Sequence, residues 1–129
     1  MRREEVPDPP PELGLRIVKP HEWTRVWARV LAAPSVKLTG FALLTWADYG
    51  DGANIRPGYP LLMRVTGIGS KSTVSAALGQ ISEWGFIWKY AEANRRMKWP
   101  DEYRLTWPDD IDGIPMMDPE WRLPGEACG

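Results

Sequence analysis

The residues best suited to chemistry stand where a glycine turn meets the start of a predicted helix. The turn is Gly67-Ile68-Gly69, and the helix is expected from residue 71 to about residue 84. The first turn of a helix has free N–H groups that attract anions, and nearby hydroxyls and an ammonium strengthen that attraction. The candidate polar residues of this segment are Ser70, Lys71, Ser72, Thr73, Ser75 and Gln80. The segment therefore predicts a site for phosphate groups, unless it is simply a capped and solvated helix face.

The same segment does not fit a nucleotide-binding loop. The P-loop pattern requires Lys directly after a glycine, with another glycine five residues earlier. Here Ser70 separates Gly69 from Lys71. The stretch at residues 63–65 is not a buried strand either. We interpret the glycine segment as the turn between two helices.

A second basic segment lies between two predicted strands, at residues 86–90 and 103–107. Its basic residues are Arg95, Arg96 and Lys98. On a hairpin tip such residues bind the phosphate backbone of DNA or enter its minor groove, with affinity that falls as salt rises. The alternative is a solvated tip. Trp88 and Trp99 flank this loop, and we expect both to pack against the sheet.

Four helices are expected to position these groups, at residues 21–33, 36–49, 59–66 and 71–84. Ser70 is the predicted N-cap of the last helix, and Gly85 ends it. Its inward face repeats at helical spacing: Val74, Ala77, Leu78 and Ile81. In the first helix Trp23 and Trp27 share one face, which predicts core packing or, alternatively, a homodimer contact.

Charge divides the chain into three parts. The net charge of −1 hides eight basic and four acidic residues in 55–106 (net +4), and one basic and six acidic residues in 107–129 (net −5). Residues 1–20 hold five prolines, and we expect a flexible or extended arm. Residues 21–107 are predicted to form the folded domain. Residues 108–129 are expected to be an acidic, irregular tail that solubilises the domain or covers its basic face.

Several classes of function lack support. One His and one Cys, the latter at position 128, cannot supply a standard zinc site. His21 has no evident nucleophile partner. No run approaches the roughly 20 apolar residues of a membrane helix. We expect a cytoplasmic protein with no catalytic residues, metal or cofactor.

With these elements placed, the chain resembles the winged helix-turn-helix domains of plasmid and phage replication-initiator-like proteins and small bacterial regulators. The resemblance covers about residues 36–107. It rests on residues 43–48 (Leu-Leu-Thr-Trp-Ala-Asp), on Ile55-Arg56-Pro57, on the spacing of Leu62, Thr66, Gly67, Ser70, Thr73 and Val74, and on that of Leu78, Gly85, Phe86 and Ile87. It implies a mainly α fold with a small β-hairpin.

The resemblance and the basic segments together predict sequence-specific binding of double-stranded DNA, in transcription regulation or DNA replication. Ser75 and Gln80 would contact base edges, since Gln pairs well with adenine. The alternative is a winged-helix module that binds a protein partner and has no intrinsic affinity for DNA. The small side chains of the helix at residues 71–84, the acidic tail and the eight tryptophans of the chain favour that alternative.

Overall fold

The computed structural model describes residues 6–94 and 96–126. In this part of the chain four α-helices stand beside a three-stranded antiparallel sheet. The helices are α1 (Pro20–Trp27), α2 (Pro34–Leu43), α3 (Gly58–Thr66) and α4 (Lys71–Glu83). The strands are β1 (Leu15–Ile17), β2 (Ile87–Ala91) and β3 (Glu102–Pro108), after a short 3-10 helix at Pro11–Leu13. The fold is thus a mixture of helices and sheet, with one strand more than the predicted hairpin.

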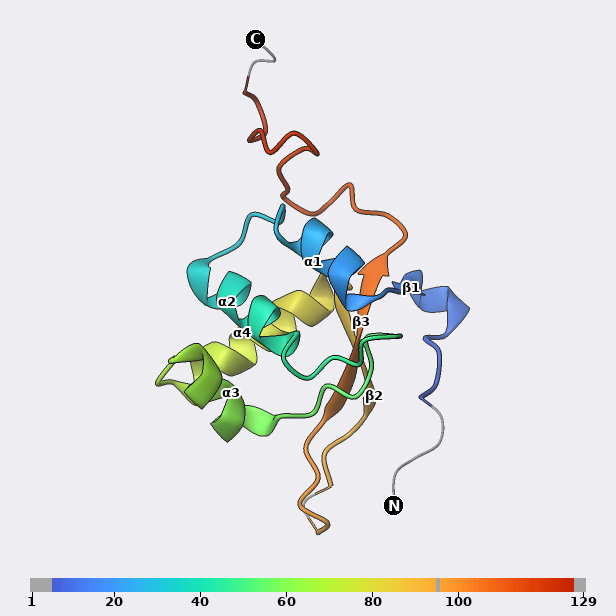
Figure 1. The fold of residues 1–129 in the computed structure, drawn as a ribbon, viewed down its shortest axis with the longest axis vertical. Helices are drawn as coiled ribbons and strands as arrows, with labels where there is room; N and C mark the ends of the chain where they lie inside the picture. The colour runs from blue at the N-terminus through green and yellow to red at the C-terminus, as the bar shows by residue number, and fades with distance from the viewer. Residues whose placement is uncertain (1–5, 95, 127–129) are drawn as a thin grey trace.

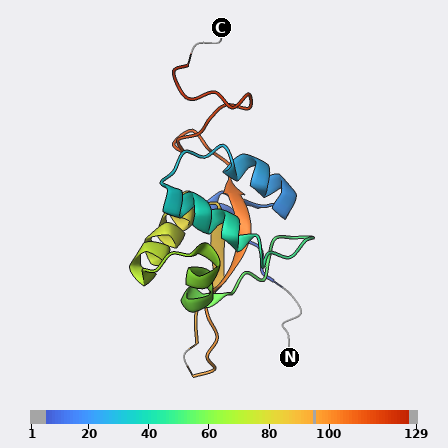
Figure 2. The same ribbon diagram turned by 60° about the vertical axis from the view of Figure 1, so that its left-hand side comes forward.

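Helices α2, α3 and α4 pack against one another, and the hairpin of β2 and β3 extends beyond them (Figure 1; Figure 2). The core lies between these helices, α1 and the sheet. Within the described residues, no helix has the length and apolar character needed to cross a membrane.

Helix α4 has the bounds predicted from sequence to within one residue, because local signals set both ends. The Ser70 hydroxyl accepts a hydrogen bond from the Thr73 N–H at 3.2 Å, as expected of an N-cap. At the other end Gly85 takes a left-handed conformation with φ 86°. The N–H groups of Gly85 and Phe86 then bond back to the carbonyls of residues 82 and 81, which closes the helix end.

Helix α1 ends at Trp27, earlier than the predicted residue 33, and a side chain from α2 binds carbonyls at and just after its end. The Lys37 ammonium donates to the carbonyl oxygens of Trp27 (2.6 Å), Ala28 (3.0 Å) and Val30 (2.8 Å). It also lies 5.4 Å from the centre of the Trp27 ring. Pro34 then begins α2 at a first-turn position, where its missing N–H costs nothing.

The two tryptophans of α1 belong to the core. Trp23 and Trp27 are both 0% exposed and stack with ring centres 5.3 Å apart. Their indole N–H groups donate to the carbonyls of Phe86 and Lys37, at 2.8 and 3.2 Å. Core packing thus accounts for both side chains, and neither reaches the surface. A homodimer through the helix that carries them stays a prediction.

Gly40 is the reason that α1 and α2 approach so closely. A Cβ atom at this position would lie 2.4 Å from atoms of the Trp27 indole ring. The indole thus lies directly on the backbone of α2. The sequence pattern alone shows Gly40 only as a weak point in a helix.

The predicted arm over residues 1–20 is extended in its second half, and it is paired with the sheet. Strand β1 pairs with β3, with Leu15 opposite Pro108, and Val18 is 3% exposed. Arg104 of β3 is buried, and its guanidinium donates to the Pro7 carbonyl at 2.8 Å. A long-range strand pair and a buried arginine therefore hold this segment against the sheet.

The acidic tail is irregular, as predicted, but its first part is docked. The Leu31 N–H donates to the Pro115 carbonyl at 2.8 Å, and the Met117 N–H donates to the Arg29 carbonyl at 2.7 Å. Ile114 packs against the core. The folded unit thus continues past residue 107. The rest of the described tail leaves the molecule at the end opposite the hairpin tip (Figure 1).

Candidate functional site

The front of α4 exposes most of the predicted polar set. Ser70, Lys71, Ser72 and Ser75 are exposed, whereas Thr73 and Gln80 are half-buried. The hydroxyls of Ser70 and Ser72 lie 2.9 Å apart. The N-terminus of α4 therefore presents two hydroxyls and an ammonium beside its free N–H groups, an arrangement suited to an anion.

The outward face of α4 carries only small side chains over two turns. Ser72, Ser75, Ala76 and Gly79 are all exposed. No atom lies within 4 Å of a Cβ placed at Gly79. The helix backbone can therefore approach a partner closely, as entry into a DNA major groove about 12 Å wide requires.

Tyr59 of α3 supports the front of α4, a role that the sequence analysis missed. The Lys71 ammonium lies 5.1 Å from the centre of the Tyr59 ring, within range of a cation–π interaction. The Tyr59 hydroxyl donates toward the Ser75 hydroxyl at 3.4 Å. The only signal in the sequence is an aromatic residue between Gly58 and Pro60, which by itself indicates no more than a helix start.

The hairpin tip exposes the second basic group. Arg96 and Lys98 are exposed, and Lys98 has a left-handed backbone with φ 58°. Backbone hydrogen bonds of 2.8 and 2.9 Å between Asn94 and Trp99 close the tip. Arg95, the third basic residue of the prediction, lies outside the described residues.

The two tryptophans near the tip differ. Trp88 is half-buried, 6.2 Å from the ring of Tyr90 on the same strand. Trp99 is 55% exposed, so the expected packing of this side chain against the sheet is wrong. Trp99 lies between the end of β2 and the start of β3, outside both strands.

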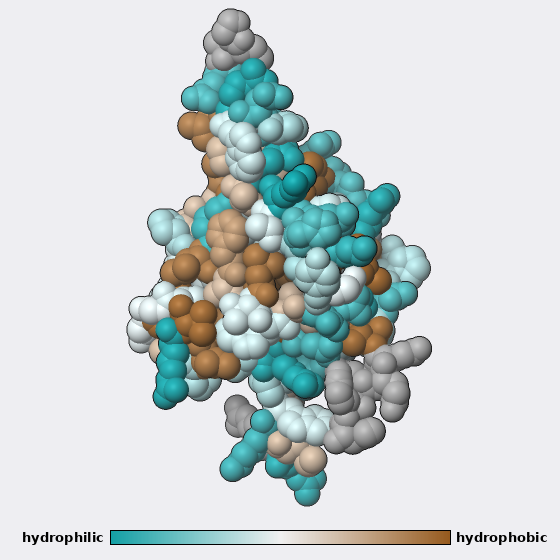
Figure 3. Space-filling view, in the orientation of Figure 1, coloured by the Kyte–Doolittle hydropathy of each residue, from teal (hydrophilic) through white to brown (hydrophobic). Residues whose placement is uncertain are grey.

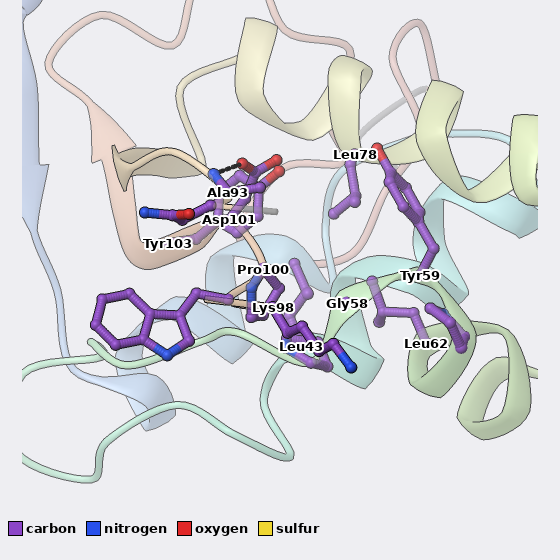
Figure 4. A pocket seen from close by; sticks show the side chains of 14 residues that line it. Leu43, Gly58, Tyr59, Leu62, Leu78, Ala93, Lys98, Pro100, Asp101 and Tyr103 are labelled. Carbon is purple, nitrogen blue, oxygen red and sulfur yellow. Dashed lines mark hydrogen bonds between the residues drawn. The ribbon is translucent and has the colours of Figure 1, made fainter. Parts of the chain in front are cut away.

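A groove of about 500 Å³ separates the helices from the hairpin. Figure 4 shows Tyr59, Leu62 and Leu78 on the helical side, and Pro100 and Tyr103 on the hairpin side. Burial, and next the Asp101 carboxylate, raise the pKa of the Tyr103 hydroxyl above its usual value. The groove walls are thus mainly apolar, and Lys98 lines its edge.

Several basic residues in the segment 55–106 form ion pairs or are buried, so their charge is not available to a partner. Arg56 lies 3.7 Å from Glu102, and Lys89 lies 3.5 Å from Glu92 and 3.6 Å from Asp101. Arg104 is buried. Among the described residues, the cations of this region without an ion pair are Arg64, Lys71, Arg96 and Lys98. The charge free to bind a partner is thus concentrated on α3, the front of α4 and the hairpin tip.

The described part of the chain contains no group of three or more His, Cys, Asp or Glu side chains that could hold a metal ion. Comparisons of the chain with protein-family models, with curated proteins and with solved structures found no match.

Proposed function

We propose that this protein binds double-stranded DNA through a winged helix-turn-helix, in which α3 and α4 form the helix-turn-helix and β2–β3 form the wing. One observation carries the proposal: a free cation of the hairpin lines the groove, and a free cation of α4 lies over an aromatic ring of its wall. Lys98 lines it from the hairpin, and Lys71 lies over Tyr59, which lines it from α3. Two basic elements that are distant in sequence thus meet around one surface.

The order of elements supports the same proposal. Helix α2 is followed by a single bridge between Ile55 and Tyr103, then by α3, α4 and the two hairpin strands. A winged helix has this order, with a short strand between its first two helices. The role would be that of a transcription regulator or a replication-associated factor.

In this mechanism phosphate contacts set the register and α4 reads the bases. Ser70, Lys71 and Ser72 would bind a phosphate at the helix N-terminus. Ser75 and Gln80 would reach base edges in the major groove. Arg96 and Lys98, with Arg95, would bind the backbone beside it and add salt-dependent affinity.

Fluorescence anisotropy with a pool of random duplexes tests the proposal. Lys71→Glu should weaken binding to every sequence, whereas Lys19→Glu, the same charge change at an exposed site before α1, should leave it nearly unchanged. Equal reductions in affinity in the two variants would show that only overall charge matters, and would remove α4 from the interface.

The wing is tested by its salt dependence. Alanine at Arg95, Arg96 and Lys98 together should flatten the plot of log K against log salt, by about 0.9 for each phosphate that these side chains neutralise. An unchanged slope would exclude the wing. Base reading is tested separately, because Gln80→Ala should relax a selected consensus at one position, by about 1–3 kcal/mol.

The second candidate function is binding of a protein partner by the same winged helix, and the surface of α3 favours it. Leu61 and Val65 of α3 are 40% and 46% exposed, and apolar side chains gather over this helix on the face drawn in Figure 3. Failure of wild type to bind any duplex at low salt would favour this candidate over DNA binding.

A further inference from the structure

The acidic tail contains one ordered turn, held by the side chain of Asp118. One carboxylate oxygen accepts from the N–H groups of Glu120 and Arg122, both at 2.9 Å. The other accepts from the Arg122 guanidinium at 2.8 Å. The hydrogen bond from the backbone N–H of Arg122 is the main reason that the pKa of the Asp118 carboxyl is lowered. These bonds join residues of the turn only, so the turn keeps its shape without help from the domain.

The turn presents Trp121 to solvent. Trp121 is 56% exposed and has a left-handed backbone with φ 67°. For a bulky residue this conformation costs on the order of 1–3 kcal/mol and persists only where its surroundings enforce it. Backbone bonds between residues 118 and 121 and between 118 and 122 enforce it here. A large indole held outward in this way is typical of an interface anchor.

The groove beside the wing has the surface that an indole prefers. Its walls carry the rings of Tyr59, Trp99 and Tyr103 and three prolines, at 57, 60 and 100. Aromatic pairs of this kind add about 0.5–1.5 kcal/mol beyond the area that they bury. The volume of about 500 Å³ is ample for one indole.

The charges of the two surfaces are complementary. Glu120, next to Trp121, and Glu126 are exposed, and the Glu126 carboxylate accepts from the Leu123 N–H at 2.6 Å. Lys98 lines the groove and Lys71 lies over the Tyr59 ring beside it, both without an ion pair among the described residues. Asp101, which also lines the groove, already accepts from the Ala93 N–H and lies 3.6 Å from the Lys89 ammonium. An acidic segment that enters the groove therefore meets free positive charge.

The tail and the groove lie at opposite ends of the molecule. In both ribbon views the described tail leaves beyond α1, and the hairpin tip projects the other way (Figure 1; Figure 2). The described tail therefore does not cover the basic face of its own chain. A second copy, approaching end to end, brings its tail to this groove without any change of fold.

We propose that Trp121 of one copy inserts into the groove between α3 and the hairpin of the next copy, and that Glu120 and Glu126 pair there with Lys71 and Lys98. Such a contact joins two different surfaces, so it propagates into rings or filaments rather than stopping at a symmetric dimer. One indole and two exposed ion pairs make a small interface, so association is weak, concentration-dependent and reduced by salt.

Sedimentation velocity of the full chain over a concentration series at low salt is the first test. Wild type should show a weight-average sedimentation coefficient that rises with concentration and falls back with added salt. Trp121→Ala should remain a monomer. Tyr49→Ala is the matched control, because Tyr49 is an aromatic residue that is 84% exposed and lies in neither surface; it should associate like wild type.

A mixing experiment then distinguishes head-to-tail contact from any symmetric one. Trp121→Ala keeps the groove, and Trp99→Glu keeps the tail while placing a like charge in the groove. Each variant alone should be monomeric, and their mixture should form a 1:1 dimer that does not grow.

Three results would overturn the proposal: a wild type that is monomeric at every concentration, a Trp121→Ala variant that associates like wild type, or a mixture that stays monomeric. Lys71 and Lys98 belong to both proposed surfaces, so duplex affinity is measured at a protein concentration where wild type is monomeric. Under that condition Trp121→Ala should bind duplex like wild type, because Trp121 has no part in the proposed DNA surface.

Discussion

Two glycines in the middle of two helices mark two different regions of this protein. At Gly40, in the corner between α1 and α2, an added Cβ would lie 2.4 Å from the Trp27 indole. At Gly79, on the outward face of α4, an added Cβ would meet nothing within 4 Å. Each glycine weakens its helix by about 1 kcal/mol relative to alanine. Contact with Trp27 explains why position 40 needs a glycine. No contact within the described residues explains the glycine at position 79, and close approach of a binding partner would.

The lysines of the two regions differ in the same way. The Lys37 ammonium donates to three backbone carbonyls in the corner. The Lys71 ammonium stands over the Tyr59 ring and has no ion pair among the described residues. The polar groups of Lys37 where α1 meets α2 are thus satisfied within the chain. The charge of Lys71 on α4 is available to a binding partner. Substitutions of the same kind in the two regions should therefore have different effects.

The largest effect is expected from Gly40→Ala. The new methyl group overlaps the Trp27 ring, so either the indole or α2 must shift, and we expect a decrease of about 3 kcal/mol in the free energy of unfolding. Urea denaturation measures this decrease. A stability equal to wild type would mean that the two helices are not held in contact at this point.

Lys37→Met should have the next largest effect. It leaves the carbonyls of Ala28 and Val30 without their donor, which costs about 2 kcal/mol, whereas the Trp27 carbonyl keeps the bond from the Val30 N–H. Burial lowers the pKa of Lys37, so removing the charge also removes a desolvation cost and limits the destabilisation. Lys19→Met, at an exposed lysine, is the matched control and should denature at the wild-type urea concentration.

Gly79→Ala should change stability in the opposite direction. With open space around the new methyl group, helix propensity alone predicts a gain of up to about 1 kcal/mol. If α4 enters a DNA groove, the same change should weaken duplex binding in anisotropy. A more stable variant with unchanged DNA affinity would show that nothing approaches the helix closely at this position.

The smallest effect is expected from Thr39→Val in α2. Thr39 is 0% exposed, and its hydroxyl has no hydrogen-bond partner in the part of the chain that the structure describes. Exchange for an apolar group of the same shape removes this unsatisfied group, so stability should stay within about 0.5 kcal/mol of wild type or rise slightly. A destabilisation above about 1 kcal/mol would indicate that the Thr39 hydroxyl has a hydrogen-bond partner. The contact region between α1 and α2 would then be more fully hydrogen-bonded than the structure shows.

The sequence predicts α4 well because its signals are local. The Ser70 cap, the spacing of the buried residues and Gly85 all lie within the helix or directly beside it. The end of α1 was not predictable in this way, since it depends on Lys37 of the next helix. Strand β1 was missed because its partner is β3, nearly the whole chain away.

In the candidate site too, features set by local sequence were predictable and features set by long-range contacts were not. Exposure of Lys71 and Ser72 follows from helical periodicity, and the structure confirms it. The contact of Tyr59 with Lys71 and the exposure of Trp99 depend on how α3 and the hairpin tip sit in space. Patterns in a single segment carry no information of that kind.

The central position of β3 also bears on how the chain folds during synthesis. Its two neighbours, β1 and β2, lie far apart in sequence, and β3 itself comes after all four helices. A nascent chain that lacks β3 cannot form the sheet, so the apolar faces of α1 and α4 stay uncovered while translation continues. Contacts between distant segments also close slowly. We therefore expect the last step of folding to follow the emergence of residue 108, and early nascent chains to depend on chaperones to stay free of aggregation.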